Sequence, residues 1–406
     1  MANGGRLIPG AERLIVDAAQ ELADKGHKVE IWTAFHDPKR SFAETVDGDF
    51  DVIVRGGWFP MSILGRGFIP LLQCFLGVPV LFYCHFPDCL LANPRSTLHR
   101  LYRWPIHHLE ESTTGMADEI VVNSRFTQGI FAQTFTRLAR RNVVPPVLYP
   151  AVAVPSEDEL RRAAATWRDA LPPWLLKAID GHGPLLLSIN RFDRKKNLPL
   201  ALRAFAAYLT QDSKTGKTSA LVFAGGYDPR LPENVEHLQE LKALAAELGV
   251  AEHVFFLPSF SDEQRGALLA AAAVVLYTPT HEHFGIVPLE AGAARRVVLA
   301  CSSGGPLESI VPGQTGELCP PDPAAWAAAL ARLLEVGHER RLAQLGNHAR
   351  ERVLRQFSRA AFGQQVETRL LQLVAQKEAA REGRAAPPEA RTQKQRQGRT
   401  TRSKAA

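Results

Sequence analysis

The sequence is poor in cysteine, and its cysteines show no pairing pattern. Only five occur in 406 residues, and none belongs to a CxxC pair. An odd number without that spacing argues against a disulfide framework and a zinc site, and it favours a reducing compartment. The composition, 46% hydrophobic and 22% charged, is ordinary for a globular protein. It excludes a collagen-like or wholly disordered chain, and the length predicts two or three domains.

Long hydrophobic runs are also lacking. The longest nearly apolar stretch, residues 68–84, contains Pro70 and Pro79. It is shorter than the ~20 residues that a membrane-spanning helix needs, and the prolines break it. Its second half predicts a buried strand, with shallow burial in a membrane surface as the alternative. The first residues contain no apolar core of the length found in a secretory signal, so none is expected.

Most of the chain, residues 1–376, carries no formal net charge. Nine of the 48 basic residues and three of the 42 acidic residues follow residue 376, so 39 of each sign remain in 1–376. The segment 377–406 is predicted to be a disordered basic tail, with contact to anionic lipid or RNA as the alternative. A folded nucleic-acid-binding domain is disfavoured, because its basic residues would cluster on one face.

What the sequence does contain is an alternation of short apolar strands and amphipathic helices, which is typical of a parallel α/β sheet. The proline-rich end of the first series predicts a domain junction near Pro150. Asp322 and Pro323 predict the start of a helix. The predicted strands are 29–32, 51–54, 78–84, 119–122, 184–189, 220–223, 253–256, 274–277 and 297–301. The predicted helices include 11–25, 98–113, 126–135, 198–209, 235–248 and 357–376.

The stretch THEHFGIVPLE, residues 280–290, carries the most chemical information. It joins a predicted strand to a helix, and a loop containing Gly285 can present backbone N–H groups to an anion. Glu282 and Glu290 are eight residues apart and suit hydrogen bonding to sugar hydroxyls. Gly304 and Gly305 follow the next strand. Singly, Glu290 could merely complement a helix dipole and the glycines could mark a turn. Together they predict a ligand site.

A second cluster, SINRFDRKKN at residues 188–197, follows the first strand of the second half. Cations at the carboxyl end of a parallel strand lie where such sheets bind ligands, and they can neutralise a diphosphate. Arg191 and Lys196 are predicted to do so, whereas Arg194 and Lys195 are interpreted as solvated. His85 follows the strand VLFYC, where it either reaches a cleft or is an ordinary core-edge histidine.

Motifs along most of residues 9–375 resemble those of one family. They are PGAERL, IWTAFHDP, LFYCHFPDCLLA, TTGMADEIVVNSRFT, SINRFDRKKNLPLALRAF, AGGYDPRLPENVEHLQEL, HFGIVPLEA and SSGGPLESI, in this order. The chain resembles the retaining GT-B glycosyltransferases of family four, and among them the alpha-1,3/1,6-mannosyltransferases of dolichol-linked N-glycan precursor assembly. Such a set in this order is far more specific than any one motif.

The resemblance implies an α/β GT-B fold, with two Rossmann-like domains facing a cleft. Residues 1–150 would form the acceptor-side domain and residues 151–356 the donor-binding domain. Residues 357–376 would be a helix that returns to the first domain, before the tail 377–406. Family members begin with a strand and a glycine-rich loop GIGGAERL, whereas here the loop is IPGAERL. The first domain is therefore predicted to lack its first strand, and residues 67–77 form an abbreviated segment.

The resemblance also assigns site residues. By position, Arg191 and Lys196 match the diphosphate-binding pair. Glu282 and Glu290 match the first and second acids of the E-x7-E motif, near the mannose ring and the ribose. The remaining assignments are backbone amides of Gly285 and Ile286, the sugar-side His85, the acceptor-side Gly10, and the base-binding loop 258–262. The sequence gives no physical account of Arg295 and Arg296.

The implied reaction transfers α-mannose from GDP-mannose to Man-GlcNAc2-diphosphodolichol, first α-1,3 and then α-1,6. It would proceed by front-face attack with the departing phosphate as base, at the cytosolic face of the endoplasmic reticulum membrane. No obligatory cofactor or metal ligand is expected, with magnesium at most a stimulant. The expected partners are the membrane surface and other mannosyltransferases of the pathway, but no nucleic acid. The alternatives are an enzyme with another acceptor, a silent GDP-binding scaffold, and an RNA binder acting through the tail.

Overall fold

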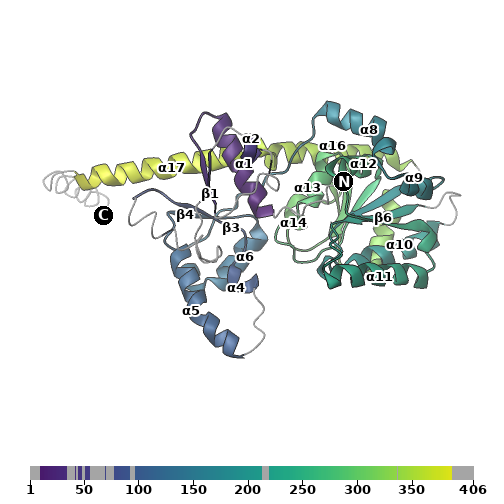
Figure 1. Ribbon diagram of the computed structural model, residues 1–406, viewed down its shortest axis with the longest axis horizontal. Helices are drawn as coiled ribbons and strands as arrows, with labels where there is room; N and C mark the ends of the chain where they lie inside the picture. The colour runs from purple at the N-terminus through teal and green to yellow at the C-terminus, as the bar shows by residue number, and fades with distance from the viewer. Residues whose placement is uncertain are drawn as a thin grey trace, which may run out of the picture.

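A computed structural model of the chain shows two α/β halves joined side by side (Figure 1). The structure describes residues 10–33, 42, 44–47, 51–54, 69, 77–91, 97–212, 219–335 and 337–385. The first two residues of the predicted IPGAERL loop, and most of the segment 67–77, lie outside this range. The tail is described only to residue 385.

The second half contains a six-stranded parallel sheet in the order β10-β9-β8-β5-β6-β7. Every residue of the four inner strands, β5, β6, β8 and β9, is buried, as expected for a parallel sheet covered on both faces. The five strands predicted here are confirmed, while β10 was missed. The strands are β5(Leu185–Ile189), β6(Ala220–Gly225), β7(Val254–Pro258), β8(Val274–Tyr277), β9(Val297–Cys301) and β10(Gly316–Cys319).

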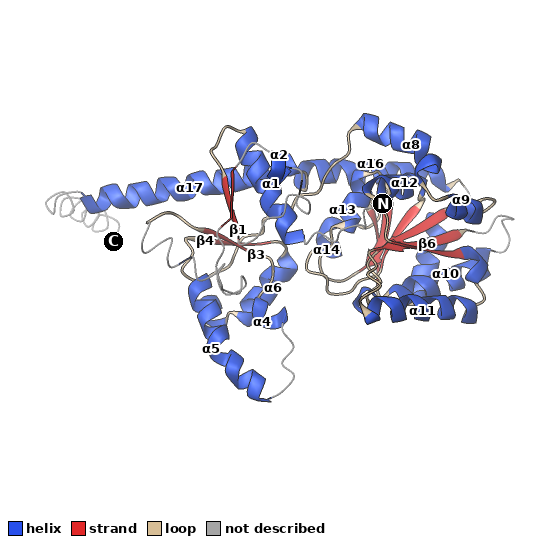
Figure 2. Ribbon diagram, in the orientation of Figure 1, coloured by secondary structure: helices blue, strands red, loops and turns tan. Residues whose placement is uncertain are grey.

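Helices cover both faces of this sheet, whose strands are drawn in red in Figure 2. Alternate strand residues point to opposite faces and pack into two separate hydrophobic clusters, one against α10, α11 and α15 and the other against α8, α9, α12 and α13. Asp322 caps α15 through Ala325 N, 2.8 Å from its carboxylate, as predicted. The helices are α8(Glu157–Ala170), α9(Pro173–Ile179), α10(Leu198–Asp212), α11(Pro232–Glu247), α12(Asp262–Ala271), α13(Val287–Ala293), α14(Pro306–Ser309), α15(Pro323–Leu333) and α16(His338–Gln356).

The first half has two separate pairs of parallel strands, β1 with β2 and β3 with β4. Within the described part of the chain no strand joins one pair to the other. The predicted strand 78–84 begins later than expected, at Leu81. The elements are β1(Glu30–Thr33), β2(Asp51–Val54), β3(Leu81–Cys84), β4(Glu119–Val122), α1(Gly10–Asp24), α2(Glu44–Asp47), α4(Asp88–Leu91), α5(Thr97–Thr114), α6(Arg125–Thr134) and α7(Thr136–Arg140).

The last helix, α17(Arg359–Ala385), leaves the second half and packs on the first (Figure 1). Phe362 and Val366 of α17 are buried against Leu14 of α1 and Val121 of β4. A Cβ on Gly363 would lie 2.4 Å from the Cβ of Glu21, so only glycine permits this approach. The helix continues through Lys377, beyond the predicted end at 376, because ion pairs such as Lys25–Glu367, 2.6 Å, and Lys377–Asp118, 3.3 Å, tie it to the first half.

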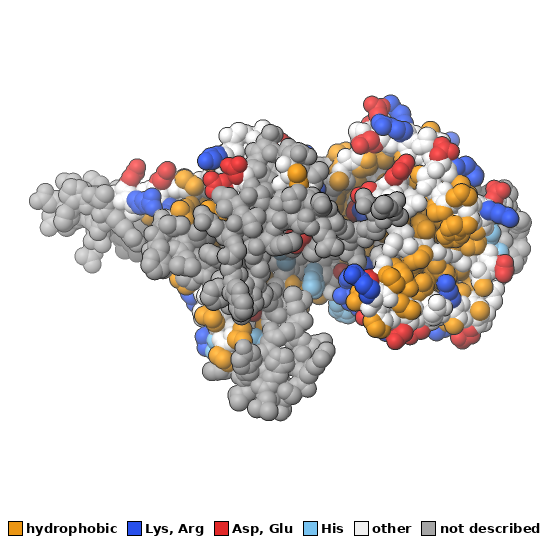
Figure 3. Space-filling view, viewed as in Figure 1, with side chains coloured by type: hydrophobic (Ala, Val, Ile, Leu, Met, Phe, Trp, Pro, Cys, Tyr) orange, Lys and Arg blue, Asp and Glu red, His pale blue; other side chains and the backbone are white. Residues whose placement is uncertain are grey.

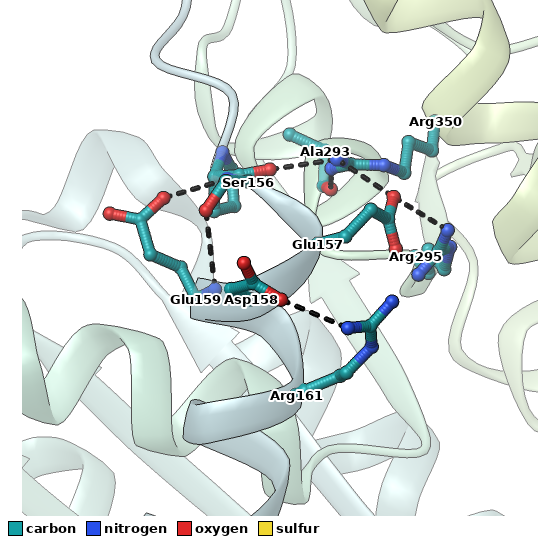
Figure 4. Close-up of polar contacts among 9 residues, drawn as sticks. Ser156, Glu157, Asp158, Glu159, Arg161, Ala293, Arg295 and Arg350 are labelled. Atoms are coloured by element: carbon teal, nitrogen blue, oxygen red, sulfur yellow. Dashed lines mark hydrogen bonds and ion pairs between the residues drawn. The ribbon is translucent and has the colours of Figure 1, made fainter.

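The two connections between the halves run side by side. Val152 N donates to Phe357 O over 2.9 Å. Beyond Val152 the chain enters α8, whose first-turn Glu157 accepts from Arg295, 2.8 Å away, and lies 3.2 Å from Arg350 (Figure 4). Arg350 also donates to Ala293 O, so this ion-pair cluster fixes α8 against α13 and α16. It accounts for Arg295, while Arg296 donates to Ala272 O over 3.2 Å.

Charged side chains of both signs are interspersed over the described surface of the second half in the view of Figure 3. This agrees with the equal numbers of basic and acidic residues in 1–376.

Candidate donor site at the carboxyl edge of the second sheet

The order of the strands predicts where the second half binds a ligand. Strand β5 lies between β6 on one side and β8 on the other, so the direction of chain progression reverses between β5 and β8. In open α/β sheets, ligands bind outside the carboxyl ends of the strands at this reversal. The cluster 188–197 leaves the carboxyl end of β5, and the loop 278–286 leaves that of β8. The two segments singled out in the sequence therefore meet here.

Lys196 and Glu282 form the centre of the candidate site. Lys196 Nζ lies 2.5 Å from Glu282 Oε1, and the side chains are 14% and 25% exposed. Lys196 is the last residue of a short 3-10 turn, Arg194–Lys196, and Asn197 follows the turn with φ 50°. Asparagine tolerates this left-handed conformation better than most residues. Thr278 Oγ1 donates to Lys196 O over 2.7 Å, which ties the two loops together.

The other cations of the cluster differ in their surroundings. Arg191 is partly exposed and pairs with Asp193 over 3.0 Å. Arg194 instead turns to α11, where its guanidinium lies 2.9 Å from Glu236 and 2.6 Å from Glu240. Lys195 is exposed. Thus Lys196 faces the loop of Glu282, while Arg194 serves to attach the turn to a helix.

Backbone geometry at Gly285 requires glycine. Its φ is +78°, and a Cβ there would lie 2.8 Å from the Tyr277 hydroxyl oxygen. Tyr277 is the last residue of β8, and burial together with the Glu282 and Glu290 carboxylates raises the pKa of its hydroxyl well above the usual range. The next residue, Ile286, lies just before the amino end of α13. The amino end of a helix can bind an anion.

Glu290 lies in the first turns of α13 and accepts from Arg265 Nη1 over 2.9 Å. Burial raises the pKa of this carboxyl group more than the Arg265 guanidinium lowers it. Arg265 belongs to α12, which follows the loop 258–262. In that loop, Ser259 has φ 61° and donates its N–H to Gly225 O over 2.7 Å. Glu290 and this loop therefore border the same edge of the sheet.

Gly304 and Gly305 have a different role from the one that the sequence suggested. They support the Glu282 loop, because Gly305 N donates to Glu282 O over 2.9 Å. A Cβ would lie 2.4 Å from Glu282 O at Gly304, and 1.8 Å from Phe284 O at Gly305. No side chain fits such distances without moving the loop. The glycine pair thus determines how closely the loop after β9 packs on the loop after β8.

Two histidines approach the site from opposite halves. His85 follows β3 of the first half, and His283 follows Glu282 in the second. The His283 ring stacks on Phe86 with centroids 3.7 Å apart. Burial, and to a smaller degree His283, lowers the pKa of His85 to about 4. Burial also lowers the pKa of His283. At neutral pH both rings are therefore uncharged.

The partly buried His85 makes stability depend on pH. In the unfolded chain a histidine has a pKa near 6.5, so between 6.5 and about 4 the unfolded state binds the additional proton. The free energy of unfolding is therefore expected to fall on acidification through this window, by at most about 1.4 kcal/mol per pH unit for one proton. Urea unfolding of His85→Gln should show a shallower dependence than wild type. His348→Gln, which changes an exposed histidine on α16, is the control, and equal slopes for all three proteins would contradict the expectation.

Two contact residues, Ser124 and Glu308, escaped the sequence analysis. Ser124, the N-cap of α6, donates to His283 O over 2.5 Å, and Glu308 of α14 accepts from the amino end of the same helix. Their local signals were present, namely a serine between a strand and a helix and an acid in a first helical turn. The sequence could not pair them, because the partners are more than 150 positions apart.

The predicted acceptor-side residue Gly10 is the first residue of α1.

A separate cavity of about 630 Å³ lies at the opposite, amino edge of the second sheet. It is lined by residues that precede β5, β8 and β9 and by the start of α16, among them Trp167, His182 and Arg296. None of the predicted site residues lines it. The candidate site is therefore defined by the loops at the carboxyl edge.

Comparison with known protein families and curated proteins places this geometry in context. Residues 177–352 match the family model "Glycosyl transferases group 1". The chain is 43% identical over 406 residues to the alpha-1,3/1,6-mannosyltransferase ALG2 of Mus musculus, covering 90% of this chain and 94% of that protein. It is 42% identical to the Homo sapiens protein of the same name, covering 88% and 92%.

Solved structures show the same fold at lower identity. The Anabaena protein Alr3699/HepE in complex with UDP is similar with a TM-score of 0.66 and 16% identity, over 91% of this chain and 98% of that one. Sucrose-phosphate synthase of Thermosynechococcus elongatus gives a TM-score of 0.63 and 22% identity, over 92% and 96%. These likenesses, with the parallel sheets described above, establish the predicted GT-B glycosyltransferase fold.

Proposed function

The chain belongs to the alpha-1,3/1,6-mannosyltransferases of N-glycan precursor synthesis, and from this premise we propose that its donor is GDP-mannose and its acceptor Man-GlcNAc2-diphosphodolichol. It is an enzyme of the GT-B class that transfers mannose from a nucleotide sugar. The observation that carries the donor-site proposal is the Lys196–Glu282 pair at the strand reversal. That position has a cation for a diphosphate and a carboxylate for a sugar hydroxyl within 2.5 Å of each other.

The proposed step is retaining and uses no protein nucleophile. The bond between the mannose anomeric carbon and the β-phosphate oxygen breaks on one face, and the acceptor hydroxyl oxygen forms its bond to the same carbon on that face. The hydroxyl proton passes to the departing β-phosphate, and GDP leaves. The protein's contribution is then to stabilise charge on the diphosphate and to position the acceptor.

Lys196 is suited to the first of these tasks. An ammonium group has three N–H donors, and the bond to Glu282 uses one of them, so two remain for phosphate oxygens. Arg191, at the same edge, offers a planar guanidinium that can bind a phosphate in bidentate fashion. The second carboxylate oxygen of Glu282 can accept from a mannose hydroxyl, and Glu290 from a ribose hydroxyl. Gly285 and Ile286 would direct backbone N–H groups toward the phosphates.

We also propose that no obligatory metal takes part, because two cations of the chain are placed to balance the diphosphate charge. Magnesium would then act at most as a stimulant. For the acceptor side we propose His85 as the histidine beside the transferred sugar. Since its ring is neutral at pH 7, it would orient a hydroxyl by hydrogen bonding and would not serve as a cation.

The location that follows is the cytosolic face of the endoplasmic reticulum membrane, where we propose contact with the membrane surface and with other mannosyltransferases of the pathway. Among the described helices, none combines the length and the hydrophobicity that crossing a bilayer demands. The exposed side chains Leu371 and Val374 of α17 are apolar and available for contacts of this kind.

The proposal is tested by mass spectrometry of the products from purified protein, GDP-mannose and a Man-GlcNAc2-diphosphate-lipid acceptor. We expect two added mannose units, sensitive to α-mannosidases of matching linkage specificity, and comparable transfer in excess EDTA. Loss of transfer in EDTA would contradict the proposal that no metal is required. GDP binding without any added mannose would contradict the proposed acceptor and would favour a different acceptor or a silent GDP-binding protein.

A further inference from the structure

The carboxylate of Glu308 crosses from the second half to the amino end of a helix in the first. It accepts from Arg125 N over 2.8 Å and from Phe126 N over 3.1 Å. These are the first two N–H groups of α6, which have no partner within the helix. An anion at this position is also favoured by the helix dipole. Glu308 is therefore an N-terminal cap supplied by the other half of the molecule.

Further contacts hold this carboxylate in place. Tyr149, in the segment that joins the halves, donates its hydroxyl to Glu308 Oε2 over 3.0 Å. Burial and the Glu308 charge raise the pKa of Tyr149 to about 12, so the hydroxyl stays a donor at physiological pH. Arg352 of α16 donates to Glu308 O and Ser309 O over 2.6 and 3.2 Å, which fixes the backbone of α14.

A second contact beside Glu308 links the same end of α6 to the Glu282 loop. Ser124 caps α6 by accepting from Thr127 N over 3.0 Å, and its hydroxyl lies 2.5 Å from His283 O. On the other side of the loop, Gly305, three residues before Glu308, donates to Glu282 O. The loop is therefore held between α6 of the first half and α14 of the second.

We propose that Glu308 is a positioning residue, which acts through the amino end of α6 to hold the Glu282–His283 loop in the arrangement needed for mannosyl transfer. This inference rests on the proposed function. It predicts a larger effect on turnover than on donor affinity, because the two cations proposed to bind the diphosphate, Arg191 and Lys196, belong to the separate loop after β5. Replacing Glu308 would displace the amino end of α6 and, with it, Ser124. The hydrogen bond from Ser124 to His283 O would then shift the neighbouring Glu282.

The test is Glu308→Gln, which preserves shape but removes the charge and turns one acceptor oxygen into a donor. We expect kcat to fall by about tenfold or more, while the Kd for GDP and the KM for GDP-mannose stay within about twofold of wild type. The matched control is Glu317→Gln in β10, where the acid lies 3.7 Å from Arg341 within the second half. This control should leave kcat unchanged.

Hydrogen–deuterium exchange gives a second measurement that does not depend on catalysis. In Glu308→Gln we expect faster exchange in two peptides, one covering α6 and one covering residues 281–290. In Glu317→Gln we expect wild-type exchange in both peptides. Faster exchange of α6 alone with normal kcat would show a merely structural cap and overturn the proposal. An equal loss of GDP affinity and kcat would overturn it too. If wild type transfers no mannose yet the two peptides loosen together, the proposed function fails while the coupling holds.

Discussion

Lys196→Ala is expected to lose most of its turnover, by about a hundredfold to a thousandfold in kcat, which is typical for removal of one donor that stabilises developing charge. The side chain supplies the ammonium nearest to Glu282, at the strand reversal. Without it, only Arg191 and backbone N–H groups would stabilise the negative charge on the departing diphosphate. The measurement is initial-rate kinetics with the lipid-linked acceptor, together with circular dichroism to show that the variant is folded.

The neighbouring Lys195 provides the control for this variant. Lys195→Ala removes the same charge from the same turn, but the side chain is exposed. We expect kcat within about twofold of wild type, because solvent screens an exposed charge. A Lys196→Ala protein with normal kcat would refute the role given to Lys196. Equal losses in both variants would show that overall charge near the site matters, and not the individual ammonium group.

Gly305→Ala is expected to reduce kcat/KM by about a hundredfold, the order of loss that follows from displacing a catalytic group by roughly 1 Å. The added Cβ would lie 1.8 Å from Phe284 O and 2.2 Å from Phe284 C, which are backbone atoms and cannot rotate away. The loop that carries Glu282 must therefore move. The adjacent Gly304 packs closely as well, since a Cβ there would lie 2.4 Å from Glu282 O, so the loop after β9 has little room to adjust instead.

Gly266 is the matched position for this substitution. It lies within α12, and a Cβ there would have no atom within 4 Å. Gly266→Ala should keep wild-type kinetics and should raise the free energy of unfolding by up to about 1 kcal/mol, since alanine favours helix over glycine. If Gly305→Ala were as active as Gly266→Ala, the close packing of the two loops would not govern the site.

Local sequence patterns predicted the second half well. Continuous apolar runs such as LLLSI predicted β5, and Asp322 with Pro323 predicted the start of α15, because both signals depend only on neighbouring residues. Strand β10, GELC, was missed because its burial comes from pairing with β9 and not from an apolar run. The end of α17 was placed too early, since the ion pairs that hold Lys377 involve Asp118, distant in sequence.

The sequence by itself determined the alternation of strands and helices, the neutral body with its basic tail, and the residue types at the donor site. It did so because periodicity, charge and glycine content are properties of short segments. Only the tertiary structure decided that the glycine pair supports the Glu282 loop, that Arg295 serves the α8 ion-pair cluster, and that Glu308 caps a helix of the other half. Such contacts join separate segments, 22 positions apart for Gly304 and Glu282 and 183 for Glu308 and Arg125, and short-range spacing carries no information about them.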